Sequence, residues 1–140
     1  MVLDKYSIGI GDRFARQGKA QLQAIIEAKN LGIDIVPVWN KSFREHSIVG
    51  TTPADVRKEA DEAVKALGWK GSYFCDADHI SLKNVDMFID SCNFFTLDVA
   101  DFIGKPADAG SVEKFVSKYS NYAGMLRVPG IAAPFNVTTE

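Results

Sequence analysis

The 140-residue sequence has few cysteines, no long hydrophobic run and almost no net charge. Its two cysteines, Cys75 and Cys92, cannot build a disulfide framework, and no Cys-x-x-Cys or Cys/His zinc pattern occurs. No stretch approaches the roughly 18 apolar residues of a transmembrane helix, and the first residues form no secretory signal. Lys and Arg number 16 against 18 Asp and Glu, a formal charge of -2, so no strong positive field exists to hold a nucleic-acid backbone. We therefore expect a soluble cytoplasmic protein with neither a nucleic-acid nor a membrane partner, and we expect both cysteines to be buried apolar residues.

Common nucleotide-binding and nucleophile motifs are also missing. Gly9-x-Gly11 lacks the third glycine of a dinucleotide fingerprint, because Phe14 stands at that position. Neither a Gly-x-Ser-x-Gly elbow nor a Walker sequence is present. These absences argue against a Rossmann domain, a serine hydrolase and a P-loop enzyme.

Short apolar segments alternate with longer amphipathic ones along most of the chain. With 46% hydrophobic and 24% charged residues, the composition is that of one globular domain or part of one. The pattern predicts one helix after each strand. The first ends at Gly32, the second runs from Thr52 to Gly68, the third starts at Ser81, and the fourth contains Val112 to Tyr119. The expected strands lie near 6–10, 33–39, 71–75 and 93–97.

Four consecutive βα units predict an α/β fold with a parallel sheet, closed either as a doubly wound sheet or as half of a TIM-like barrel. The short, regular spacing and right-handed crossovers favour the barrel half, with strand order 1-2-3-4. A 2-1-3-4 order would indicate a doubly wound fold instead. We expect the four units to span 1–120 and a hairpin-like excursion around Pro129-Gly130 to occupy 121–140.

Ionisable side chains gather where the predicted strands end, and the opposite strand ends hold few. Both closures place functional residues at the carboxyl ends of strands, so this asymmetry indicates an active-site face. The candidate residues on it are Asp12, Arg13, Asn40, Lys41, Arg44, Glu45, His46, Asp76, Asp78, His79, Asp98 and Asp101.

Two groups of these candidates have a definite chemistry. Asp78 and His79 point to opposite sides of a regular strand, but at a strand end both can reach one site, where imidazole and carboxylate suit a transition metal. The alternative is that His79 only holds the loop through a backbone bond. After Trp39, which we expect to be exposed, Lys41 and Arg44 can bind an anionic group such as a carboxylate or phosphate. The alternative for this second group is a solvated loop.

Several segments, taken in order, resemble the tagaturonate/fructuronate epimerases. The likeness covers most of residues 6–104 and is weaker beyond. The matching segments are Tyr6–Phe14, Gln17–Leu22, Pro37–Ser42, Arg44–His46, Val56–Asp61, Ala66–Trp69, Asp76–Ile80 and Phe95–Gly104.

This resemblance implies a metal-dependent, TIM-barrel-like isomerase of hexuronate catabolism that interconverts D-tagaturonate and D-fructuronate. It implies that Asp78 is the proton acceptor and that His79 binds a divalent metal cation. Eight of the other candidates are then expected to bind the sugar acid: Asp12, Arg13, Asn40, Lys41, Arg44, Glu45, His46 and Asp98.

Members of that family are several hundred residues long, so we expect this chain to be a fragment whose further metal ligands and general acid lie beyond Glu140. Two alternatives stay open. One is another metal-dependent sugar-acid aldolase or isomerase, and the other is a non-catalytic half-barrel. A half-barrel also leaves its outer strands unpaired, so self-association through these edges is expected.

Overall fold

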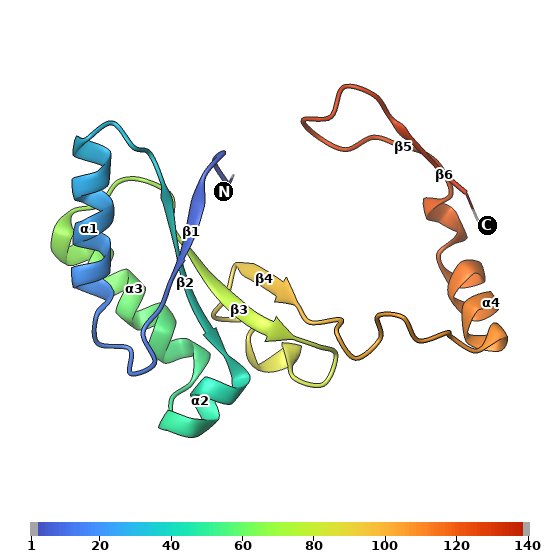
Figure 1. The fold of residues 1–140 in the computed structure, drawn as a ribbon, viewed down its shortest axis with the longest axis horizontal. Helices are drawn as coiled ribbons and strands as arrows, with labels where there is room; N and C mark the ends of the chain where they lie inside the picture. Colours follow the sequence, from blue (N-terminus) through green and yellow to red (C-terminus); the bar gives the residue numbers. More distant parts are fainter. Residues whose placement is uncertain (1–2, 139–140) are drawn as a thin grey trace. The chain divides into compact units, whose positions relative to one another are not determined.

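The computed structural model describes residues 3–138, and Figure 1 shows their elements in chain order. The first part of the chain alternates strands with helices, as the sequence pattern predicts. The elements are β1 (Ser7–Ile10), α1 (Gly18–Asn30), β2 (Val36–Ser42), α2 (Phe43–Val49), α3 (Pro53–Leu67), β3 (Phe74–Ile80), the 3-10 turn η1 (Val85–Met87), β4 (Phe94–Leu97), α4 (Ala109–Lys118), the 3-10 turn η2 (Ser120–Tyr122), β5 (Gly124–Leu126) and β6 (Phe135–Val137).

The four predicted strands form one parallel sheet in the order β1-β2-β3-β4, which confirms the sequential order and excludes the 2-1-3-4 arrangement. Such a sheet is compatible with part of a barrel. β2 and β3 begin and end later than predicted, because pairing continues through polar residues. Asn40 pairs with Asp76 and Ser42 with Asp78, so residues expected just beyond the strands lie within them.

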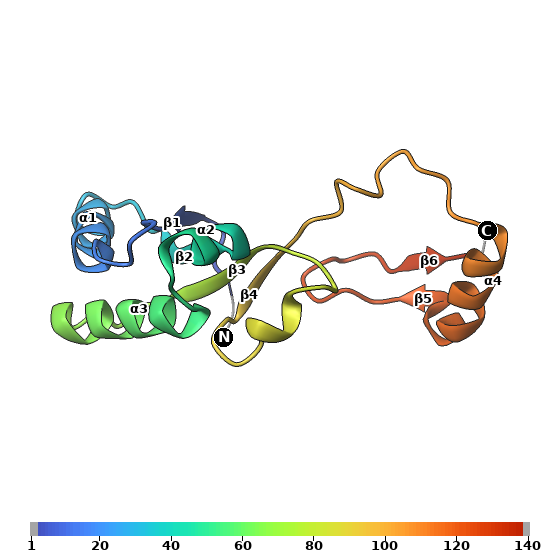
Figure 2. The same ribbon diagram turned by 90° about the horizontal axis from the view of Figure 1, so that it is seen from below.

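Helices α1 and α3 pack together on one face of the sheet and form the main core (Figures 1 and 2). Leu22 and Ala60 bring the two helices onto Trp39 and Cys75 of the sheet. Trp39 is 1% exposed, so the expectation of an exposed tryptophan is wrong. Strand alternation turns its side chain to the helix layer, away from the face that carries Val38. Burial also raises the pKa of the Cys75 thiol to about 12, which makes it unreactive.

A smaller apolar cluster occupies the opposite face of the sheet. Val36, Val38 and Phe74 are buried there, and the ring of Phe94 meets Phe74 edge-on at a centroid distance of 6.1 Å. Further along the same strands this face becomes polar at Asp76 and Asp78. This face of the sheet is therefore apolar near the start of the strands and polar near their carboxyl ends.

The sequence pattern predicts both ends of α3 correctly but does not predict α2. α3 begins after Thr52, whose backbone N–H donates to Asp55 at 2.6 Å, and ends at Gly68 with a left-handed φ of 63°, as predicted. Residues 43–49 form α2, a helix that the sequence pattern does not predict. The missed signal is a capping box, in which Ser42 and Glu45 exchange hydrogen bonds at the helix start.

The prediction of a helix from Ser81 is wrong, because only the short turn η1 forms there. The side chain of Asn84 accepts a hydrogen bond from the Ser81 N–H at 2.8 Å and so competes with the helical pattern. Phe88 is buried, whereas Leu82 is 97% exposed.

A second compact unit starts at Phe102 and contains α4 and the β5–β6 pair. β5 and β6 are antiparallel, with Leu126 opposite Phe135, so the predicted hairpin-like excursion around Pro129-Gly130 is confirmed. The division predicted after residue 120 stays a prediction. Over the described part of the chain, no helix has the length and apolar character needed to cross a membrane.

Candidate functional site

A polar cavity of about 510 Å³ lies where β2, β3 and β4 end. It brings together five of the predicted site residues from three parts of the chain. Its lining residues are Ser42, Phe43, Arg44, Glu45, Asp78, His79, Asn84 and Asp98. The guanidinium of Arg44 and the imidazole of His79 thus share one cavity with three carboxylates. Imidazole and carboxylate groups can transfer protons, and a guanidinium can bind an anion.

His79 reaches this cavity because β3 is irregular there. The pairing with β4 shifts register between Ala77 and Ile80, and His79 has a φ of 54°, which non-glycine residues rarely adopt. Asp78 Oδ1 lies 2.8 Å from His79 Nδ1, and the two side chains are 15% and 64% exposed. The irregularity therefore places neighbouring side chains on the same side, which a regular strand does not do.

Asp76 lies one pleat before Asp78 and faces the next strand. Its two carboxylate oxygens accept hydrogen bonds from the backbone N–H and the hydroxyl of Thr96, at 3.1 and 2.7 Å. Asp76 is 6% exposed, and burial raises its pKa despite the bonds from Thr96. Asp76 does not line the cavity, and its carboxylate connects β3 to Thr96 of β4.

Arg44 and Glu45 belong to the first turn of α2, and the capping box fixes this turn at the end of β2. The Ser42 N–H bond is the main cause that lowers the pKa of Glu45. Arg13, from the loop after β1, lies outside the lining but its Nε is 3.8 Å from Glu45 Oε1. Arg44 is exposed and lines the cavity, so it is a cation available to a ligand there.

Asp12 and Asn40 do not line the cavity, and both lie close to the backbone of the loop after β1. Asp12 accepts bonds from the N–H groups of Phe14, Arg16 and Gln17. Burial alone would raise its pKa, but these bonds outweigh burial and lower it. Asn40 passes close to Gly11, where an added Cβ would collide with the Asn40 carbonyl oxygen, so only glycine fits there.

Lys41 and His46 lie on the helix side of the sheet, each 2% exposed, and the structure does not bring them to the cavity. Lys41 follows Asn40 in β2, so strand alternation points it away from the polar face. His46 contacts the ring of Phe88 and bonds Thr51 Oγ1 through Nδ1 at 3.0 Å. Burial, reinforced by nearby Lys41, lowers the pKa of His46 to about 4.

The buried His46 predicts a loss of stability in mild acid. Its folded pKa of about 4 lies below the ordinary 6.5, so the unfolded chain takes up the proton first as pH falls. The stabilisation is complete above pH 6.5 and decreases towards pH 4, by up to about 3 kcal/mol. Urea unfolding of His46→Gln should therefore show a flatter pH dependence than the unsubstituted chain over this range. The exposed His79 gives the matched control, and an equal flattening in His79→Gln would contradict the prediction.

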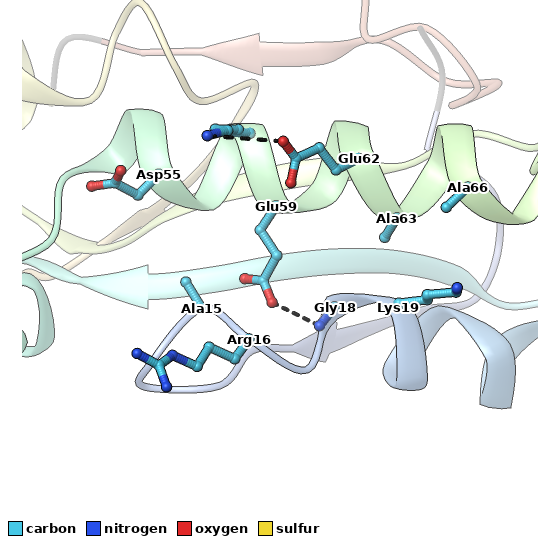
Figure 3. Close-up of a pocket in the computed structure, with 10 residues that line it drawn as sticks. Ala15, Arg16, Gly18, Lys19, Asp55, Glu59, Glu62, Ala63 and Ala66 are labelled. Carbon is cyan, nitrogen blue, oxygen red and sulfur yellow. Dashed lines mark hydrogen bonds and ion pairs between the residues drawn. The ribbon is translucent and has the colours of Figure 1, made fainter.

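A second cavity of about 400 Å³ lies between the start of α1 and α3 (Figure 3). Glu59 extends across it from α3 and accepts a bond from the Gly18 N–H at 2.7 Å. Its charged lining combines Arg16 and Lys19 with Glu62 and Asp55. This cavity belongs to the helix layer and contains none of the residues predicted for the site.

Sequence reasoning missed three residues that line the site cavity: Ser42, Phe43 and Asn84. The Ser-x-x-Glu spacing of residues 42–45 is a visible capping signal that could have placed Ser42 and Phe43 at a helix start. Asn84 has no such signal, because its position follows from the turn that replaces the predicted helix.

His79 is suited to bind a metal ion as one ligand. Its Nδ1 is engaged by Asp78, so Nε2 is the ring nitrogen left for an ion, the arrangement that carboxylates give to metal-binding histidines. Within residues 3–138, however, no three His, Cys, Asp or Glu side chains are placed to hold one ion. The described residues therefore fit part of a metal site and not a complete one.

The fold and the cavity together define a parallel α/β protein whose polar site lies at the carboxyl ends of its strands. A sequence model of the tagaturonate epimerase family (UxaE) matches residues 1–128. The chain therefore belongs to the tagaturonate epimerase family, an isomerase family, as the sequence resemblance predicts. No curated protein matches the chain.

Solved structures agree with this assignment. The native crystal structure of the fructuronate-tagaturonate epimerase UxaE from Cohnella laeviribosi is 25% identical and superposes with a TM-score of 0.63, covering 94% of this chain. Its complex with two glycerol molecules is 23% identical, with the same TM-score and the same coverage of this chain. In both cases the chain spans 29% of the length of the solved protein.

Proposed function

We propose that this chain forms part of a metal-dependent, cytoplasmic epimerase that interconverts D-tagaturonate and D-fructuronate. In that reading its sheet is the first half of a TIM-like barrel. The observation that carries the proposal is the single cavity that holds Arg44, Asp78, His79 and Asp98 in a member of the epimerase family. A cation for the substrate carboxylate, a proton acceptor and a metal ligand then face the same space.

The proposed reaction is a retro-aldol cleavage followed by aldol addition. The inverted carbon is not next to the ketone, so one enolisation cannot invert it. Asp78 accepts the proton of the hydroxyl on the inverted carbon, and the bond between this carbon and its neighbour on the ketone side breaks. The electron pair of that bond moves to the ketone fragment, which becomes an enediolate, and the inverted carbon becomes an aldehyde. The aldehyde fragment turns, the bond forms again on its other face, and Asp78 returns the proton. When bound, a divalent cation supplies Lewis-acid stabilisation of negative charge.

In this proposal His79 is one metal ligand, and residues outside the 140 supply the others. Asp78 has Oδ1 engaged by His79, which leaves Oδ2 for the substrate proton. Arg44 holds the substrate carboxylate, a role that the buried Lys41 cannot share from the helix side of the sheet. Asp98 and Glu45 are proposed to contact sugar hydroxyls, since both line the cavity.

Arg44→Ala is expected to raise KM for keto-uronates roughly 10- to 100-fold, the loss of one charge-assisted hydrogen bond. The effect on matching neutral ketohexoses should be much smaller, because these sugars have no carboxylate. Steady-state kinetics on an active, longer chain measure both effects, with Arg16→Ala as the control because Arg16 is exposed and outside the cavity. Equal effects on both substrate classes would assign Arg44 a structural role. A panel of other keto-uronates separates this epimerase from a related sugar-acid aldolase or isomerase.

We also propose that the 140-residue chain self-associates through its outer strands. Within the described part of the sheet, β1 and β4 are outermost, and Leu97 on β4 is 70% exposed. Size-exclusion chromatography with light scattering is expected to show species larger than one chain. Leu97→Lys should shift them towards the monomer, because a charged edge disfavours pairing, whereas Leu82→Lys in the turn should not. A monodisperse monomer of the unsubstituted chain would refute the proposal.

A further inference from the structure

We propose that Asp76 is a positioning residue: through Thr96 it fixes the irregular end of β3 so that Asp78 and His79 face the same cavity. The inference rests on the proposed function, because this alignment affects catalysis only if these two residues carry it out. Asp76 is not itself in the cavity lining, and its role is therefore exerted through the backbone.

The first step of the argument is the geometry that needs support. A regular strand would turn Asp78 and His79 to opposite faces, towards the cavity and the helix layer. Instead, the register of β3 against β4 shifts between Ala77 and Ile80, and His79 adopts a φ of 54°. A positive φ at a histidine costs free energy, so this conformation persists only where neighbouring contacts enforce it.

The second step identifies those contacts. Before the irregularity, both oxygens of Asp76 bind one residue of β4, through the N–H and the hydroxyl of Thr96 at 3.1 and 2.7 Å. After it, the Asp98 N–H donates to the Ile80 carbonyl at 2.9 Å. Residues 77–79 are thus held between two fixed points on the same neighbouring strand. The Ile80 bond is an ordinary backbone bond, whereas the first point depends on a buried side chain.

The third step connects the geometry to chemistry. With β3 held in this way, Asp78 Oδ1 lies 2.8 Å from His79 Nδ1, which keeps the proton of the neutral ring on Nδ1. Nε2 then carries the lone pair. If the Asp76 contact is lost, β3 is free to return to regular pairing, and His79 turns from Asp78 and takes up the Nε2–H form that exposed histidines ordinarily prefer.

The experiment measures the His79 tautomer by imidazole ¹⁵N chemical shifts in the 140-residue chain at pH 8, without substrate or metal. The unsubstituted chain should show mainly Nδ1–H, and Asp76→Ala and Thr96→Val should shift His79 to mainly Nε2–H. Asp76→Asn should retain Nδ1–H, because its carbonyl can still accept from the Thr96 N–H and its amide can donate to the hydroxyl. Glu59→Gln is the matched control, since Glu59 is a partly buried carboxylate outside the cavity that, like Asp76, accepts a backbone N–H.

Retention of the Nδ1–H form in both Asp76→Ala and Thr96→Val would overturn the inference, and so would an Nε2–H form in the unsubstituted chain. An equal shift in Glu59→Gln would show a general loss of structure and would overturn it as well. If Asp76→Ala does not fold, Thr96→Val decides the question, because it keeps a side chain of similar volume. Since no turnover is measured, a failed Arg44 experiment would reject the proposed function and leave this result in place.

Discussion

His79→Ala is expected to abolish metal binding and epimerase activity together in a chain long enough to be active. An imidazole whose Nδ1 is held by Asp78 offers Nε2 to the ion, and alanine offers no donor atom. Loss of a ligand removes most of the metal affinity, so we expect metal content by elemental analysis to fall to background. Turnover should fall at least about 1,000-fold, since metal and orientation are lost at once.

Asp78→Asn is the informative partner of this variant. An amide oxygen can still accept the His79 Nδ1–H but cannot take up a substrate proton, so metal should stay bound while turnover falls roughly 100- to 10,000-fold. His46→Ala removes the other histidine of the chain and should leave metal content unchanged, because His46 is buried on the helix side. If His79→Ala keeps its metal, the ligand assignment is wrong.

Trp39→Ala is expected to reduce the free energy of unfolding by about 3–5 kcal/mol. Trp39 is 1% exposed and lies in the core between the sheet and the two helices, with Tyr73 edge-on at 6.1 Å. Removing its ring leaves a cavity that the surrounding α1, α3 and β3 cannot fill without moving. Urea unfolding followed by circular dichroism measures the loss.

Two further variants test the cause of this loss. Trp39→Phe should cost much less, because it keeps an aromatic ring and removes a buried indole N–H that has no hydrogen-bond partner among the described residues. Trp69→Ala should also cost less, since Trp69 is only partly buried at the edge of the same core. A loss in Trp69→Ala as large as that in Trp39→Ala would contradict the proposed place of Trp39 at the centre of the core.

Sequence patterns were sufficient to predict the order of the strands, the limits of α3 and the end of the sheet at which the polar cavity lies. Short apolar strands separated by amphipathic helices allow few topologies, because right-handed crossovers of this length lead each strand to the next position in the sheet. Local signals are enough for a helix such as α3, where Thr52, Pro53 and Gly68 act within one turn of its ends. Arg44, Asp78, His79 and Asp98 converge because strand ends of a parallel sheet meet at one edge.

Which of the charged residues face the cavity depends on strand pairing and packing, and the sequence pattern does not reveal it. Lys41 is a cation like Arg44, and His46 carries an imidazole like His79. Pairing through Asn40 and Ser42 nevertheless turns Lys41 to the helix layer, and His46 packs from α2 against Phe88. His79 would face the helix layer too if β3 were regular, and the register shift against β4 brings it to the cavity. The direction of a strand side chain depends on pairing with its neighbours, and hydrogen bonds from residues about 20 positions away, such as that between Asp76 and Thr96, set that pairing.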